Sequence, residues 1–177
     1  MEFKIVRDKE LAKLIFIQGH LTNDENKNNY TVDQFEKAWA KWIGFYVLYD
    51  DVHVVAFCGI RKFDNHEARI FDRYFVMPDY RKGSLAHAEW SSIMVETLVN
   101  DCIENGYKPF FSIQTAKKRR AIDVAVLKFN KYTKDTHEFK VLHGLYCTVP
   151  TSRDDPTCWQ NIATISPYSI SLEKQHE

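Results

Sequence analysis

The segment VMPDYRKGSLA, residues 76–86, places Pro, Tyr, Arg, Lys, Gly and Ser between an apolar stretch and a segment with helical spacing. A strand that passes directly into a helix leaves several backbone N–H groups without partners, and these groups attract anions together with the helix dipole. Gly83 permits the close approach of a ligand, and Arg81 and Lys82 add positive charge. The segment predicts a pyrophosphate site, although an ordinary turn with an exposed basic pair has the same local sequence.

A second group that could do chemistry is Asp72, a carboxylate inside the apolar segment at residues 68–77. Side chains alternate between the two faces of a strand, so Asp72 is expected on the same face as Tyr74 and Val76. A carboxylate on that face could take a proton from a substrate ammonium group, directly or through water.

The alternative for Asp72 is a structural ion pair with Arg69 or Arg73, which lie close to it in the sequence. His66 and Glu67, just before the same strand, are further candidate bases.

A basic run, KKRR at residues 117–120, stands where a helix is expected to begin. Positive charges at that end oppose the helix dipole, so a solvated helix face is the ordinary explanation and a phosphate-bearing ligand is the alternative. The chain has 24 basic and 24 acidic residues and a formal net charge of zero. This balance argues against a nucleic-acid-binding protein.

The cysteines and histidines are scattered. Four Cys and seven His occur without a C-x-x-C or H-E-x-x-H pattern, so we expect no metal site and a reduced, cytosolic setting. The first ten residues, MEFKIVRDKE, are charged from the first turn, so no signal peptide is expected. No apolar run approaches the roughly 20 residues that a membrane span needs.

Hydrophobic periodicity and turn signals predict the elements that hold these groups in a single domain, residues 1–177. Strands are expected at residues 3–7, 45–50, 53–63, 68–77, 109–115, 138–149 and 159–166, and helices at 8–20, 31–44, 85–104 and 116–133. Strands joined by tight turns run antiparallel and strands joined through a helix run parallel, so the fold class is α/β with one mixed sheet. Its order is β-α-α-β-β-β-α-β-α-β-β.

Capping residues mark the ends of these helices. Asp8 and Thr31 are the expected N-caps, and Gln34 completes a capping-box pattern with Thr31. Gly44 and Gly106 are the expected helix ends, with Gly106 in a left-handed conformation.

The element order and the segment FVMPDYRKGSLA together resemble the GCN5-related N-acetyltransferase (GNAT) family over nearly the whole chain. The acetyl-coenzyme A signature of that family reads V-x-P-x-[YF]-R, followed by Q/R-x-x-G-x-G/A. The first half is matched by Val76, Pro78, Tyr80 and Arg81. Ala86 fills the last position, whereas Ser84 stands at the central Gly and Gly83 lies one place early.

The resemblance implies that the strand ending at Val76 splays away from the strand at residues 109–115, and that the pantetheine arm of acetyl-coenzyme A lies in this gap. An N–H group of Val76 or Met77 would then polarise the thioester carbonyl. The implied coenzyme-binding residues are Phe75, Val76, Met77, Arg81, Lys82, Gly83, Ser84, Leu85 and Ala86.

The function that the resemblance implies is transfer of an acetyl group from acetyl-coenzyme A to an amine, either a small molecule or a peptide. Direct attack in a ternary complex is expected, because no Cys or Ser stands in an activated-nucleophile setting. The alternative is a coenzyme-binding or interaction module that kept the fold and lost catalysis. The polar segment at residues 21–30 is the expected acceptor-side loop. The assembly is left open, with a homodimer as one form.

The helix after the splayed strand commonly carries a Tyr in this family, in the pattern A-x-x-[LF]-Y-x-K, which protonates the departing thiolate. Alignment of Ala125 and Lys131 with this pattern puts Phe129 at the Tyr position. Tyr132, three residues on and nearly on the same helix face, is the hypothesised acid. Tyr146 and water are the alternatives.

Overall fold

The computed structural model describes residues 1–22, 29–64, 66–81, 83–114, 125–131, 139–146 and 160–165. The elements are, in chain order, β1 (Glu2–Ile5), α1 (Lys9–Phe16), α2 (Gln18–Thr22), α3 (Val32–Trp39), β2 (Trp42–Asp50), β3 (His53–Lys62), β4 (Glu67–Val76), α4 (Gly83–Glu104), β5 (Lys108–Gln114), β6 (Phe139–Tyr146) and β7 (Gln160–Ile165). Residues 125–131 are also helical.

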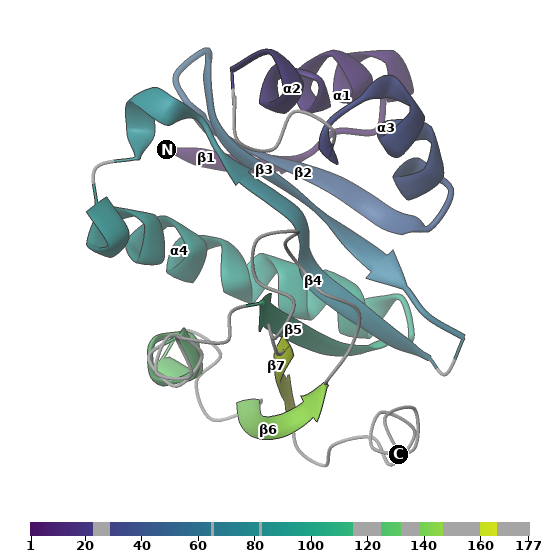
Figure 1. The fold of residues 1–177 in the computed structure, drawn as a ribbon, viewed down its shortest axis with the longest axis vertical. Coiled ribbons are helices and arrows are strands. Elements are labelled where there is room, and N and C mark those ends of the chain that lie inside the picture. The colour runs from purple at the N-terminus through teal and green to yellow at the C-terminus, as the bar shows by residue number, and fades with distance from the viewer. Residues whose placement is uncertain are drawn as a thin grey trace.

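One mixed sheet organises the fold, in the strand order β1-β2-β3-β4-β5-β7-β6. Neighbouring strands are antiparallel except for β4 and β5, which are parallel because α4 connects them. Helices α1, α2 and α3 lie on one face of the sheet and α4 lies on the other (Figure 1). The predicted mixed α/β class is therefore confirmed.

Each face of the sheet has its own core. On the α4 face, Met94, Leu98 and Cys102 of the helix are buried together with Ile70 and Val76 of β4. The other face is rich in aromatic side chains, with ring centroids of neighbours about 5–6 Å apart as in most buried aromatic pairs. This aromatic core consists largely of Phe16, Tyr30, Phe35, Trp42, Phe45, Phe57 and Phe75.

Two of the predicted N-caps are confirmed. The Asp8 carboxylate accepts a hydrogen bond from Leu11 N at 3.0 Å, and the Thr31 hydroxyl accepts one from Gln34 N at 3.2 Å. Gly106 adopts the expected left-handed conformation, with φ at 84°.

The predicted end of α3 at Gly44 is wrong. The helix stops at Trp39, and β2 begins at Trp42, which pairs with Arg61 of β3. The N–H of Lys41 closes the connecting turn by donating to Ala38 O at 2.9 Å. Trp42 would be buried both in a last turn of the helix and at the start of a strand. Apolar spacing alone therefore did not distinguish the two.

The two parallel strands at the centre of the sheet diverge. Their pairing joins Glu67–Arg69 of β4 to Lys108–Phe110 of β5. Within the described lengths of the two strands no further pairing joins them, since β4 continues to Val76 while β5 pairs with β7 on its other edge. The expected splay is confirmed, and it opens toward the C-terminal end of β4.

None of the helices that the structure describes has the length and apolar character needed to cross a membrane.

Candidate active site

The free edge of β4 faces the gap between β4 and β5. The N–H of Met77 donates to Val55 O of β3 at 2.8 Å. Hydrogen-bonding direction alternates along a strand in an antiparallel pair, so the N–H and C=O of Val76 point away from β3 and toward the gap. Of the two N–H groups considered from the sequence, Met77 is therefore engaged in the sheet and Val76 lies at the open edge.

Arg81 closes the turn that follows this edge. Its Nε donates to Val76 O at 2.6 Å, and its guanidinium carbon lies 4.7 Å from the centroid of the Phe75 ring. The turn itself is a 3-10 segment at Pro78–Tyr80, and α4 begins at Gly83. The predicted strand, turn and helix are confirmed in that order, with an arginine held over the end of β4.

The remaining predicted coenzyme residues lie in or near the first turn of α4. The backbone of Ser84, Leu85 and Ala86 is helical, which leaves the first N–H groups of α4 without partners inside the helix. Lys82 lies outside the described residues. Phosphate binding at this turn stays a prediction.

Asp72 does not lie where strict alternation puts it. The register of β4 against β3 runs Phe57↔Phe75, Gly59↔Asp72 and Arg61↔Arg69, so β4 carries one extra residue in each interval. These are two β-bulges, and they reverse the alternation twice. Asp72 therefore faces the α3 side, whereas Tyr74 and Val76 pack on the α4 side. The predicted shared face of Asp72, Tyr74 and Val76 is wrong.

Two side chains hold the buried Asp72 carboxylate. Trp42 Nε1 donates to Oδ2 at 2.9 Å, and Arg69 Nη1 lies 3.6 Å from Oδ1. The expected ion pair with Arg69 is thus present. Arg73 instead donates to Gln34 Oε1 at 3.0 Å and to Asn29 O at 3.4 Å. Asp72 is 5% exposed, and its role as a base stays a prediction.

Gly59 makes the Trp42–Asp72 hydrogen bond possible. A Cβ atom at Gly59 would lie 2.3 Å from Trp42 Cε2 and Nε1, so the indole ring rests directly on the glycine backbone. Gly59 also pairs with Asp72 across the β3–β4 ladder. Local sequence patterns do not reveal this trio, because Trp42 and Asp72 are 30 positions apart.

Tyr30 is a second group that the sequence did not point to. Its hydroxyl donates to Tyr74 O at 3.4 Å, and its ring packs against Phe75 with centroids 4.9 Å apart. Burial raises the pKa of Tyr30 to about 12, and the Asp72 charge also raises this pKa, while Arg73 and Arg81 lower it. The phenol is therefore protonated at neutral pH and lies between the bulges and the end of β4.

The other candidate bases lie at the opposite end of β4. Glu67 pairs with Lys108 where β4 and β5 are still joined, and His66 precedes it. At about 3.3 Å per residue, Glu67 is roughly 25–30 Å along the strand from Val76. These positions do not bring Glu67 or His66 to the open end of the gap.

A cavity of about 210 Å³ opens beside Asp72 on the α3 face. It is lined by Gln34, Lys37, Ala38, Lys41, Arg61, Asp72 and Arg73. Four of these residues are basic, so the cavity carries a concentrated positive charge around one carboxylate.

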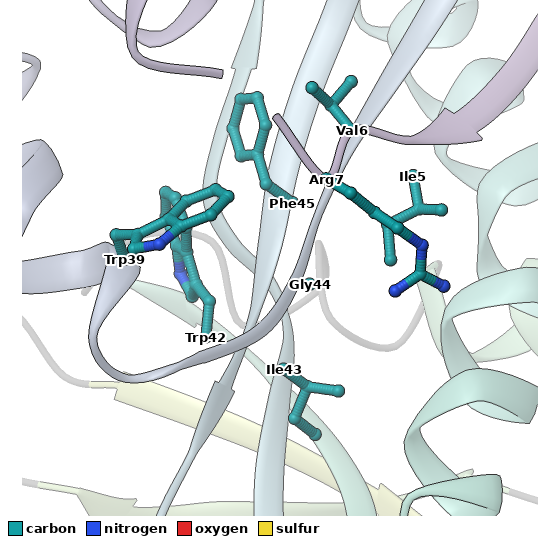
Figure 2. A pocket seen from close by; sticks show the side chains of 8 residues that line it. All are labelled: Ile5, Val6, Arg7, Trp39, Trp42, Ile43, Gly44 and Phe45. Carbon is teal, nitrogen blue, oxygen red and sulfur yellow. The ribbon is translucent and has the colours of Figure 1, made fainter. Parts of the chain in front are cut away.

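A second cavity, of about 200 Å³, lies between β1, the end of α3 and the start of β2. Figure 2 shows the Trp39 and Trp42 rings next to each other, with the Arg7 guanidinium directed away from them. Arg7 is the one charged residue among the eight that line it, so this cavity offers no proton acceptor.

No protein-family model matches the sequence, and no curated protein matches it. Solved structures match it in fold. An acetyltransferase of the GNAT family from Bacteroides thetaiotaomicron has a TM-score of 0.57 at 12% identity, over 99% of this chain and 92% of that chain. The aminoglycoside 6'-N-acetyltransferase from Enterococcus faecium has a TM-score of 0.63 at 13% identity, over 96% and 99%. A Bacillus subtilis acetyltransferase in complex with CoA has a TM-score of 0.53 at 9% identity, over 93% and 96%. This chain has the GNAT fold.

On this GNAT fold, Phe129 occupies an apolar site. It is 5% exposed, stacks on Phe71 with centroids 5.4 Å apart, and meets the Phe111 and Phe139 rings. Tyr132 and the side chain of Tyr146 lie outside the described residues. The acid assigned to Tyr132 from the sequence stays a hypothesis.

The described thiols are unsuited to nucleophilic attack. Cys58 and Cys102 are free and buried. Burial raises the pKa of Cys102 to about 12 and the pKa of Cys58 well above its usual range, with Asp72 adding to the shift at Cys58. Within the described ranges, no three His, Cys, Asp or Glu side chains are grouped as metal ligands.

Proposed function

We propose that this protein transfers an acetyl group from acetyl-coenzyme A to an amine by direct attack in a ternary complex. The observation that carries the proposal is the divergence of β4 and β5 beside the open main-chain edge at Val76. The gap is bordered by a turn that leads straight into the first N–H groups of a 22-residue helix.

The residues present at this gap fit the coenzyme. The main chain at Phe75, Val76 and Met77 offers an extended edge for an amide-bearing arm. Arg81, Lys82 and the backbone from Gly83 to Ala86 would hold the pyrophosphate, by charge and by free N–H groups. Acetyl-coenzyme A supplies an activated acetyl group in the form of a thioester. The CoA complex of the Bacillus subtilis structure supports this assignment.

The chemistry requires one proton acceptor and one polarising donor. The ammonium group first loses one proton, and the neutral amine nitrogen then bonds to the acetyl carbon as the C–S bond breaks. A second proton leaves the nitrogen, and the thiolate takes up one proton, so one proton in total is released. The Val76 N–H is the donor that would stabilise negative charge on the acetyl oxygen. Asp72 would orient the ammonium group or take its proton, directly or through water, while Trp42 and Arg69 fix its position.

The proton for the sulfur has three candidate sources. Tyr132 is the one assigned from the sequence, and water is the simplest. Tyr30 is a further candidate, because its protonated hydroxyl contacts Tyr74 O beside the gap. Buried thiols support a mechanism without a covalent intermediate. The reduced cytosolic setting and the homodimer stay predictions.

Coenzyme binding can be tested by calorimetry on the full chain. Gly83→Val should crowd the first turn of α4, and Arg81→Ala should remove a positive charge, so both should weaken coenzyme A binding by about tenfold or more. Lys4→Gln on β1 is the matched control, since Lys4 pairs with Glu2 at the far edge of the sheet. Unchanged affinity in two folded variants would exclude this turn as the site.

Catalysis is tested separately, with a panel of amines and the Asp72→Asn variant. We expect kcat/KM to fall in Asp72→Asn between about pH 6 and 9, because the amide keeps the shape but cannot take a proton. Coenzyme binding without turnover on any amine would favour the alternative, a binding module on the same fold.

A further inference from the structure

The cavity beside Asp72 has the features of a specificity site. Its walls come from four separate segments: α3, the turn that contains Lys41, the end of β3 at Arg61, and the bulged part of β4 at Asp72 and Arg73. Its volume of about 210 Å³ has room for a small acidic group with a few attached carbons.

Three of the four basic side chains of the cavity have no acidic partner among the described residues. Within the described part of the chain, Lys37 pairs with Asp33 at 2.9 Å, whereas no ion pair joins Lys41, Arg61 or Arg73 to a carboxylate. The buried Nε of Arg61 also has no hydrogen-bond partner there, and its guanidinium carbon lies 5.1 Å from the Phe63 ring centroid. Three like charges around one cavity repel each other unless an anion lies between them.

Asp72 does not supply that anion. Oδ2 accepts from Trp42 Nε1 and Oδ1 lies 3.6 Å from Arg69 Nη1, and within the described residues no ion pair joins Asp72 to Arg61 or Arg73. Each oxygen of Asp72 keeps a further lone pair that an ammonium group can approach. The cavity therefore combines a carboxylate at one wall with guanidinium and ammonium groups at the others. A molecule with one positive and one negative group matches both.

The cavity is also close to the proposed reaction gap. Asp72 and Arg73 line the cavity, and Val76 at the open edge follows them by four and three positions, roughly 10–13 Å along β4. Between them, the Tyr30 hydroxyl donates to Tyr74 O. An acceptor held in the cavity therefore lies within roughly that distance of the gap.

We infer that the cavity binds an acidic group of the acceptor, so the acceptors of this protein are amines that carry a carboxylate or a phosphate. This inference rests on the proposed acyl-transfer function. Arg61, Arg73 and Lys41 hold the acidic group, and Asp72 faces the ammonium group.

The kinetic test compares matched pairs of amines that differ only in the acid. γ-Aminobutyrate is compared with its amide, and phosphoethanolamine with ethanolamine, so that the two pairs separate a carboxylate from a phosphate. The acidic member should have kcat/KM at least about tenfold higher. Arg61→Gln and Lys41→Gln should bring this ratio toward one, and Arg61→Lys should keep part of it. Lys4→Gln is the control and should leave the ratio unchanged.

A binding test does not depend on turnover. Glutarate and inorganic phosphate are titrated into the full chain without coenzyme, and Arg61→Gln, Arg73→Gln and the Lys4→Gln control are measured alongside. Loss of binding by about tenfold in the two arginine variants supports the inference. Lys41→Gln is measured as well. Lys41 is exposed, so this variant should fold normally and still weaken anion binding.

The outcomes separate the two proposals. Acetyl transfer with equal kcat/KM for acidic and neutral amines would overturn the acidic-acceptor inference and keep the acyl-transfer function. If coenzyme binds but no amine is acetylated, the proposed function fails, and the inference about the acceptor fails with it. If the chain then still binds glutarate or phosphate, and Arg61→Gln loses this binding, the cavity is an anion site with no role in acceptor recognition.

Discussion

Gly59→Ala is the sharpest test of how Asp72 is held. The new Cβ would lie 2.3 Å from two atoms of the Trp42 ring and 2.6 Å from a third, whereas ordinary contact needs about 3.4 Å. The indole must therefore move by about 1 Å, and its 2.9 Å hydrogen bond to Asp72 would lengthen beyond useful range.

The cost follows from two effects. Overpacking a core position costs about 1–3 kcal/mol, and losing a hydrogen bond to a charged group costs about 1.5–3 kcal/mol. Alanine in a strand recovers about 0.5–1 kcal/mol relative to glycine, so the expected net loss in the free energy of unfolding is about 2–5 kcal/mol. A loss of this size is a large fraction of the stability of a single domain.

The assay is urea unfolding of Gly59→Ala beside a matched strand variant, Gly44→Ala. At Gly44 the nearest atom to a new Cβ is Ile5 Cδ1 at 2.9 Å, the end of a flexible side chain, so the loss should stay below about 1.5 kcal/mol. A Gly59→Ala variant within about 1 kcal/mol of the parent would refute the reasoning. If Asp72 takes the proton, Gly59→Ala should also lower kcat/KM on any amine acceptor.

Three further outcomes are expected. Because the Tyr30 pKa is raised from its ordinary value of 10.0 to about 12, the folded protein keeps this proton while the unfolded chain loses it, so stability should fall as pH rises from about 10 to 12. In urea titrations, Tyr30→Phe should remove up to about 2.7 kcal/mol of this decrease in the free energy of unfolding. The same decrease in both proteins would show that Tyr30 is not its source. Iodoacetamide should label Cys58 only in urea, because this thiol is buried and its pKa is raised. Rapid labelling of Cys58 in the native chain, located by peptide mass spectrometry, would disprove this. Phe129→Tyr should destabilise the protein by about 1–3 kcal/mol, because the hydroxyl enters an apolar ring cluster, and an unchanged unfolding midpoint would mean that the hydroxyl finds a partner.

The elements could be predicted from the sequence where local rules decide them. Asp8 and Thr31 begin helices because their side-chain oxygens satisfy free N–H groups, and Gly106 ends α4 because it tolerates positive φ. The splay of β4 and β5 followed from the resemblance to the GNAT family and not from the periodicity of either strand. The end of α3 was missed because the burial of Trp42 suits both a helix and a strand.

The candidate site was only half predictable. The turn at residues 76–86 is contiguous in sequence, so its residue types and their order were visible together. The support of Asp72 comes from Trp42 and Gly59, and the cavity comes from α3, β3 and β4. Such groups meet only after the sheet has formed, and residues 13 to 30 positions away give no local signal.

The two bulges explain how β4 borders both the gap beside β5 and the cavity beside α3. Phe71 and Arg73 have φ values of 56° and 53°, a conformation that costs bulky residues of order 1–3 kcal/mol each. Because of this conformation, the neighbouring residues Asp72 and Arg73 both line the cavity on the α3 side. In a regular strand, consecutive side chains point to opposite faces. A regular strand would place either the carboxylate or the guanidinium beside α3, and the other among the side chains that pack on α4. The strained backbone thus puts a carboxylate and a guanidinium group side by side, a few residues from the open edge at Val76.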